Sequence, residues 1–249
     1  MEVHAMGNGM FNTTRWSLVI GTRADSDDGR AALETLCCAY RSPVAAYLRA
    51  RGHPPSDADD MTQAFFEQLL RRRMHAMADP ARGRFRGFLL ASLRNFLSSQ
   101  REHERAGKRG GGQAALALEP GVDLVDTRAM TPEQVFERDY ALTVIARALD
   151  RLREEAASAG KAGLFDQVSG FLLEPPDAQE YAELAGKLDM RRNTLAVAIH
   201  RLRTRLREMV RMELCETVDS PDALDAEILA LRRALPGHAI EAGDATQAA

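Results

Sequence analysis

The chain has 249 residues, which is room for one large domain or two small ones. Apolar residues make up 45% of it, enough to build real cores, and the single Trp and four Tyr favour helical packing over a β-sandwich. The net charge of −3 hides a strong segregation, because residues 71–112 and 191–211 are basic whereas residues 113–180 and 212–249 are acidic. Two separate basic blocks predict two places that contact a polyanion.

Several classes of protein are excluded by what the sequence lacks. It has no Gly-rich phosphate loop, no cluster of metal ligands and no Ser/His/Asp or Cys/His arrangement, so we expect no enzyme, no metal and no cofactor. Its cysteines, Cys37, Cys38 and Cys215, form no CxxC motif and are interpreted as reduced, buried thiols. Without a secretion signal or a membrane-length apolar run, the protein is expected to be cytoplasmic, with no membrane partner.

The first half of the chain predicts three main helices. Residues 30–48 have a helical apolar period, with Pro43 expected to bend or divide the helix. Ser56 is predicted to cap the next helix, whose first turn is acidic, as the helix dipole favours. The third helix is predicted over residues 85–105, with one apolar face and one polar, basic face.

A change in composition separates this half from the rest. Residues 110–132 hold four glycines, two prolines and scattered acids, which indicates a linker between domains. A helix is predicted to begin at Pro132, because proline suits the first helical turn, and another around residues 165–172. Asp177 is predicted to cap the helix that follows.

Residues 181–210 have the sequence shape of a helix-turn-helix. A short apolar period ends near Leu188, and after a break of about four residues a second one begins at Leu195. The second helix and its flanks are strongly basic, which predicts a surface for phosphates; the alternative is an ordinary amphipathic helix with a solvated arginine face. Side chains before its first buried leucine point past the helix N-terminus, where a recognition helix meets bases and phosphates. They are Arg191, Arg192, Asn193 and Thr194.

The chain ends in an acidic segment in which Ser220 is predicted to cap a helix over residues 224–235. No strand-like alternation occurs anywhere, so the expected fold class is all-α. We expect two helical bundles joined by a flexible linker, the second with the helix-turn-helix, plus an acidic C-terminal helix. The predicted domains are residues 12–109 and 133–212, with residues 213–249 as an acidic extension.

Two stretches carry recognisable motifs. SDADDMTQAFFEQLL matches the pattern D-A-E-D-L-x-Q-[DE]-x-F at Asp57, Ala58, Asp59, Asp60, Met61, Gln63 and Phe66. LAGKLDMRRNTLAVAIHRLRTRLRE matches L-A-x-x-L-G-x-S-x-G-T-V-K-S-R-L-H-R-A-R at Leu184, Ala185, Leu188, Thr194, Leu195, His200, Arg201 and Arg203. In this order the two motifs resemble the second and fourth domains of extracytoplasmic-function sigma factors, the two-domain form of the sigma-70 family of bacterial transcription initiation factors. The resemblance covers roughly residues 30–110 and 134–211.

The resemblance implies that RNA polymerase core is a partner. The family's acidic helix docks on a coiled coil of the largest polymerase subunit, and its winged-helix-like fourth domain docks on the flap of the second-largest subunit. The implied core contacts are Asp57, Asp60, Gln63 and Phe66, with the phenyl ring as an apolar anchor. The alternative is that the aspartates are only first-turn acids.

The resemblance also implies two contacts with promoter DNA. The polar face of helix 85–105 would meet the melted promoter element through Arg94, Asn95, Ser98, Ser99 and Arg101. The second helix of the helix-turn-helix would enter the major groove of the other element through Arg191, Arg192, Asn193, Thr194, Val197, Ala198 and Arg201. For each single residue the alternative is a solvated charged face.

The sequence departs from the family in its recognition helix. Ala196 and Ala198 stand where the family usually has Lys and Arg. Base readout is therefore expected to rest on the residues at the start of the helix and on apolar contact with thymine methyl groups.

A second departure lies in the acidic helix. Ala64 replaces the acid that usually follows Gln63, and a hydroxyl, Thr62, lies two residues away. A phosphate on Thr62 would restore about −1.5 to −2 charge. The pattern resembles the sigma subgroup switched on by a Ser/Thr protein kinase, which leads to the hypothesis that Thr62 is a phosphorylation switch. The alternative is an ordinary helix threonine.

The rival function is a stand-alone helix-turn-helix transcriptional regulator that dimerises through its C-terminal extension. This reading accounts for the helix-turn-helix but gives no role to helix 57–66 or to the basic block at 71–112. The acidic helix near the C-terminus is expected either to mask the basic recognition helix or to pack on it.

Overall fold

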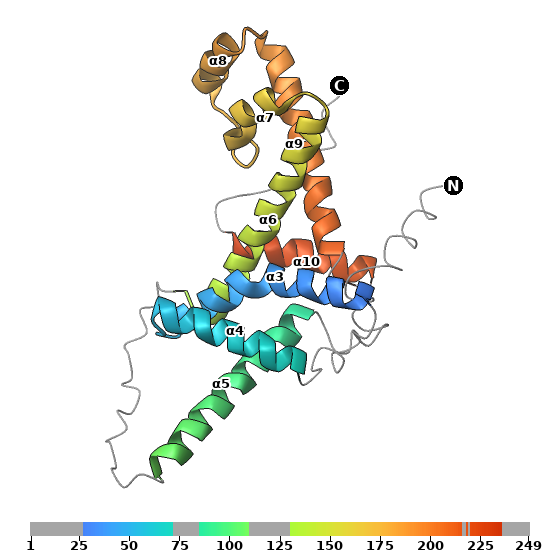
Figure 1. Ribbon diagram of the computed structural model, residues 1–249. Helices are drawn as coiled ribbons and strands as arrows, with labels where there is room; N and C mark the ends of the chain where they lie inside the picture. The colour runs from blue at the N-terminus through green and yellow to red at the C-terminus, as the bar shows by residue number, and fades with distance from the viewer. Residues whose placement is uncertain (1–26, 72–84, 110–129, 216–217, 219, 236–249) are drawn as a thin grey trace. The chain divides into compact units, whose positions relative to one another are not determined.

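The computed structural model describes residues 27–71, 85–109, 130–215, 218 and 220–235 (Figure 1). These residues form α-helices and one short 3-10 helix, and no β-strand occurs among them. The prediction of an all-helical chain is confirmed for this part. The helices divide between two compact units, an N-terminal unit whose helices run to Tyr140 and a C-terminal unit whose helices begin at Ala141.

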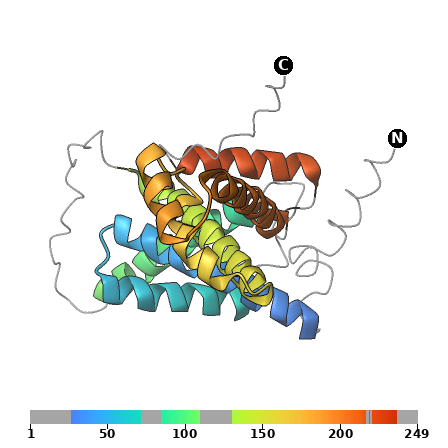
Figure 2. The same cartoon turned by 90° about the horizontal axis from the view of Figure 1, so that it is seen from above.

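The N-terminal unit contains α3 (Asp27–Ala50), α4 (Pro55–Arg71), α5 (Phe85–Arg109) and the first part of α6 (Pro132–Ser158). Helices α3 and α4 lie side by side and run in opposite directions, joined by a tight turn at Gly52 (Figures 1 and 2). Gly52 has a φ of 89°, a conformation that glycine adopts without strain. Pro43 is buried inside α3, which continues through it, so the predicted division of this helix is wrong.

Aromatic rings form the core of the N-terminal unit, with Tyr40 of α3 in their midst. Its ring stacks on Tyr140 of α6 at 4.9 Å between centroids and meets Phe85 of α5 edge-on at 5.3 Å. Phe136, one helical turn before Tyr140, lies at 6.4 Å from Tyr40. Such pairs add about 0.5–1.5 kcal/mol each to the burial of their area. Residues 132–140 of α6 therefore complete the core of the N-terminal unit.

The C-terminal unit contains the rest of α6, α7 (Ala162–Val168), the 3-10 helix η3 (Ser169–Phe171), α8 (Ala178–Lys187), α9 (Arg192–Cys215) and α10 (Pro221–Ala234). A cluster of buried apolar side chains joins α7, α8 and α9. Its members are Val168, Leu184, Ala185, Leu195 and Ile199. Because Leu195 and Ile199 are four residues apart, they fix one stripe of α9 toward the core and leave the opposite stripe to solvent.

Two of the three predicted helix caps are confirmed. The Asp177 carboxylate accepts hydrogen bonds from the backbone N–H groups of Gln179 and Glu180, and the Glu180 carboxylate accepts one from the Asp177 backbone N–H, a complete capping box. Ser220 accepts from the Ala223 backbone at the start of α10. The Ser56 cap is wrong, because α4 begins at Pro55 and the Ser56 hydroxyl donates to Asp57 instead.

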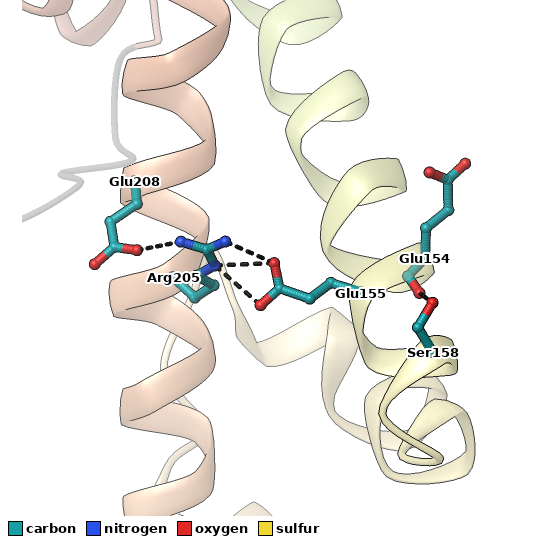
Figure 3. A network of polar contacts seen from close by, with 5 residues as sticks. All are labelled: Glu154, Glu155, Ser158, Arg205 and Glu208. Carbon is teal, nitrogen blue, oxygen red and sulfur yellow. Dashed lines mark hydrogen bonds and ion pairs between the residues drawn. The ribbon is translucent and has the colours of Figure 1, made fainter. Parts of the chain in front are cut away.

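Helix α9 is tied to α6 by ion pairs within the C-terminal unit. Arg205 of α9 donates to both carboxylate oxygens of Glu155 of α6 and to Glu208 (Figure 3). Further along α9 the carboxylate of Glu213, which is buried, lies 2.7 Å from Arg151 Nε and 3.6 Å from Arg147 Nε of α6. These contacts orient the basic helix about its own axis.

The predicted domain limits fall partly outside the described residues, namely at residues 12–26, at 110–129 of the linker and at 236–249 of the extension. The described start of the second predicted domain, residues 133–140, packs with the N-terminal unit. None of the described helices is both long enough and apolar enough to cross a membrane.

Candidate nucleic-acid interface

A tight turn of four residues, 188–191, joins α8 to α9. Asp189 adopts a left-handed backbone with a φ of 49°, which Asp tolerates better than most residues. The Met190 backbone N–H closes the turn by donating to the Ala185 carbonyl at 3.0 Å. Leu188 and Met190 pack partly buried on the apolar cluster, so the turn is held from both sides. The start of α9 is thereby fixed relative to α8.

The predicted DNA contacts at the start of α9 are largely exposed. Exposed side chains are Arg191, Arg192, Asn193, Thr194, Val197 and Arg201. Val197 is 43% exposed, which is unusual for a β-branched apolar side chain in the middle of a helix. Ala198 differs, because it is half-buried and lines a pocket between α6, α7 and α9. It lies beside the core stripe, next to Ile199.

Sequence reasoning left out one member of this face. His200 is exposed and lies three residues beyond Val197 and seven beyond Asn193, so it shares their stripe of the helix. The i, i+4, i+7 spacing from Asn193 was the available signal. An imidazole can donate and accept hydrogen bonds, which suits it to base edges.

The arginines of α9 are not equally available to phosphates. Arg205 donates hydrogen bonds to two carboxylates. The bonds to Glu155, and to a smaller extent the bond to Glu208, raise the pKa of Arg205 above the usual range. The same hydrogen bond lowers the pKa of Glu155. Arg211 lies 3.8 Å from Asp225 of α10. The number of arginines in the helix therefore exceeds the number available to bind phosphates. The available basic side chains are concentrated toward the N-terminal half of α9.

Helix α10 packs on α9 near its C-terminal end, where Arg211 meets Asp225 (Figure 1). Thr194 precedes Arg211 by 17 residues on the same helix, a span of about 25 Å at 1.5 Å per residue. Of the two expectations for the acidic helix, packing rather than masking therefore describes α10.

The polar face of α5 is exposed as predicted from its periodicity. Arg94, Asn95, Ser98, Ser99 and Arg101 are all exposed, whereas Leu89, Leu93, Phe96 and Leu97 on the opposite face are buried. The C-terminal part of α5 projects beyond α3 and α4 in Figure 1. Hydroxyl and amide groups thus lie between two arginines on an open helix surface.

Arg94 is engaged by a carboxylate that the sequence did not reveal. Its Nη2 lies 2.8 Å from Oε1 of Glu133, in the first turn of α6, and the Tyr47 hydroxyl donates to the same oxygen at 3.4 Å. The hydrogen bond that Arg94 donates to Glu133 is the largest cause of the raised pKa of Arg94, and a smaller one is its interaction with Tyr47. Burial is the largest single effect on Glu133 and would raise its pKa. The hydrogen bond and the charge of Arg94, together with the other hydrogen bonds to this carboxylate, outweigh burial, and the pKa is lowered.

The predicted partner-binding residues lie on α4. Asp57, Asp60 and Gln63 are exposed, and Gln63 donates to Glu67 at 3.0 Å. Phe66 is half-buried and lines a groove of about 500 Å³ between α3 and α4. The acids that line this groove are the exposed Glu34 and Glu67, and they lie beside apolar side chains, a surface that fits a partner carrying both basic and apolar groups.

The expectation that all three cysteines are buried is wrong. Cys38 is exposed and Cys37 half-buried, so only Cys215 is the buried thiol that was expected. Burial, followed by the neighbouring Cys38, raises the pKa of Cys37 to about 12.

Thr62 is only 1% exposed, and its hydroxyl donates to the Ala58 carbonyl at 2.7 Å. A kinase could reach this hydroxyl only after the side chain leaves that position.

No protein-family model matches the chain, and the comparisons with curated proteins and with solved structures found no match either.

Proposed function

We propose that this chain is a sigma factor of the extracytoplasmic-function type, which directs the core of bacterial RNA polymerase to specific promoters. The observation that carries the proposal is the pair α8–α9, two helices joined by a tight four-residue turn, with the start of the second helix exposed and basic. This is the geometry in which a recognition helix presents its N-terminal residues to the major groove.

The turn adds a physical argument for the motif resemblance. Asp189 stands where the family motif has Gly, and its left-handed φ of 49° is the conformation for which Gly is usually required. The residue thus keeps the backbone of the motif although its side chain differs. Val197 and Asn193, exposed on one stripe, supply an apolar contact for thymine methyl groups and a donor and acceptor for adenine.

In the N-terminal unit, the exposed face of α5 would bind the melted promoter strand. Unstacked bases expose edges that Asn95, Ser98 and Ser99 can hydrogen-bond, while Arg101 and Arg94 hold phosphates. The groove between α3 and α4, which Gln63 and Phe66 line on its α4 side, would receive the polymerase largest subunit. The exposed Asp57 and Asp60, earlier on α4, would add polar contacts beside it.

Phosphorylation of Thr62 by a Ser/Thr kinase remains a separate proposal. Because the hydroxyl is buried and hydrogen-bonded to Ala58, phosphorylation requires the Thr62 side chain to rotate toward the groove that it lines. A phosphate there would add negative charge beside Gln63 and Phe66, which supports a role in core binding rather than in DNA binding.

A stand-alone regulator is the second candidate. The observation in its favour is Leu229 of α10, which is 47% exposed and could join a dimer interface. The regulator would bind duplex DNA as a dimer without polymerase.

The experiment that tests the sigma proposal is transcription with purified core polymerase on fragmented genomic DNA, followed by sequencing of transcript 5′ ends. We expect initiation at a small set of sites that share two upstream elements. Transcripts that start no more specifically than those of core enzyme alone would refute the proposal.

A further inference from the structure

The ion pair between Arg94 and Glu133 places an acid on the surface where the proposed function puts single-stranded DNA. Arg94 is 54% exposed and Glu133 is 35% exposed, so the pair lies at the edge of the α5 polar face rather than in the core. We propose that Glu133 competes with DNA for Arg94: it holds the guanidinium in the free protein and must yield it to a phosphate when the strand binds. This inference rests on the proposed function of α5.

Glu133 is held in place independently of Arg94. Thr131 and Gln134 form a reciprocal cap at the start of α6, with the Gln134 side chain accepting from the Thr131 backbone at 2.8 Å and the Thr131 hydroxyl accepting from the Gln134 backbone at 3.2 Å. Phe136 and Tyr140 anchor the same segment in the aromatic core. The carboxylate is thus delivered to α5 by a rigid helix start.

Carboxylate and phosphate bind a guanidinium through the same fork of N–H donors, so Arg94 cannot satisfy both fully. Glu133 also cancels the charge that Arg94 contributes to the face and lies close enough to repel an incoming phosphate. Arg86, two turns earlier on α5, differs, because it is buried and bonded to Glu137 at 2.8 Å under the ring of Tyr140. That pair is structural, whereas the exposed pair can exchange partners.

The test is a double-mutant cycle in the full chain, with Glu133→Gln, Arg94→Gln and the double variant. Affinity is measured by fluorescence anisotropy with a labelled mixed-sequence single-stranded DNA of about 15 nucleotides, a length within the range that such surfaces cover. We expect Glu133→Gln to bind about three- to ten-fold more tightly and Arg94→Gln more weakly than the unchanged protein. The double variant should bind like Arg94→Gln alone, because the competitor has nothing left to compete for.

Two controls separate competition from other effects. Glu154→Gln removes one exposed negative charge from the C-terminal unit, which has no part in the proposed competition for Arg94, and should leave the affinity within about two-fold. Thermal melting shows whether Glu133→Gln keeps the fold, as the Thr131–Gln134 cap leads us to expect.

The possible results separate the competition by Glu133 from the proposed binding of single-stranded DNA by α5. Equal tightening by Glu133→Gln with and without Arg94 would mean a general charge effect and would overturn the inference, as would no tightening at all. In either case weakened binding by Arg94→Gln would leave the proposed role of α5 intact. Absence of single-stranded DNA binding by the unchanged protein, both free and with polymerase core, would count against that role itself.

Discussion

Arg205 of α9 donates three hydrogen bonds of 2.7 to 3.0 Å to the carboxylate of Glu155 of α6, 50 positions earlier in the sequence (Figure 3). The fork of the guanidinium matches the two carboxylate oxygens, so the contact fixes direction as well as distance. Together with the buried stripe through Leu195 and Ile199, this pair orients α9 about its axis, and with it the direction in which Asn193 and Val197 face.

Replacing Glu155 with Gln should lower the free energy of unfolding by about 0.5–1 kcal/mol, because both partners are partly exposed and solvent screens them. The neighbouring variant Glu154→Gln is the matched control, since its carboxylate points away from the network in Figure 3. Urea unfolding of the two variants checks the prediction. Equal stability of the two would show that the Arg205 pair contributes nothing.

The same pair predicts a pH dependence. The hydrogen bond from Arg205 lowers the pKa of Glu155 in the folded state, so its contribution is fully present above the unfolded value of about 4.3 and is lost as the pH falls through the folded pKa. The stability difference between the unchanged protein and Glu155→Gln should therefore be full at pH 7 and shrink at more acidic pH, below about pH 4. Urea unfolding at a series of pH values measures it; a difference that grows on acidification would contradict the assignment.

Tyr140 should matter to the N-terminal unit although it follows the predicted linker. Tyr140→Ala removes the ring stacked on Tyr40 and should cost about 3–5 kcal/mol of stability. Leu142→Ala, two residues along the same helix and 48% exposed, should cost less than about 0.5 kcal/mol. Hydrogen exchange of α3 and α5 locates the effect, and unchanged protection there in Tyr140→Ala would refute the placement.

Local patterns were readable from the sequence, and long-range ones were not. The caps at Asp177 and Ser220 depend on residues within three positions, and the buried stripe through Leu195 and Ile199 follows from the helical period. The Arg94–Glu133 pair joins positions 39 residues apart on two different helices, α5 and α6, and no local sequence pattern predicts it. The half-burial of Ala198 could not be predicted from the sequence, because the width of the buried stripe on α9 depends on the side chains of α6 and α7 that pack against it.

Thr62 shows the same limit, since its burial depends on packing. Thr62→Val should cost about 1 kcal/mol through the lost hydrogen bond to Ala58, and Thr62→Glu should cost about 1–3 kcal/mol by forcing a charge into a buried position. Chemical denaturation measures both. If Thr62→Glu is as stable as the unchanged protein, the side chain reaches the groove easily, and the phosphorylation proposal gains a physical route.

Asn193 should affect recognition without affecting stability. Because its side chain is exposed, Asn193→Ala should change the free energy of unfolding by less than about 0.5 kcal/mol. Its loss should cost about 1–3 kcal/mol of discrimination between the correct base pair and others. Competition binding with duplex variants measures this, with Thr204→Ala, exposed further along α9, as the control. Equal loss in both variants would remove Asn193 from the recognition face.

The sigma-factor proposal requires that this chain bind RNA polymerase core, so we would first measure binding of the purified protein to that core. We compare Asp57→Asn in α4 with Asp222→Asn in α10, because each removes an exposed acid from the first turn of a helix. We expect the unchanged protein and Asp222→Asn to bind core, after kinase treatment if Thr62 is a switch, and Asp57→Asn to bind more weakly. Tight binding to duplex DNA with no binding to core, with or without kinase treatment, would refute the sigma-factor proposal and favour the stand-alone regulator.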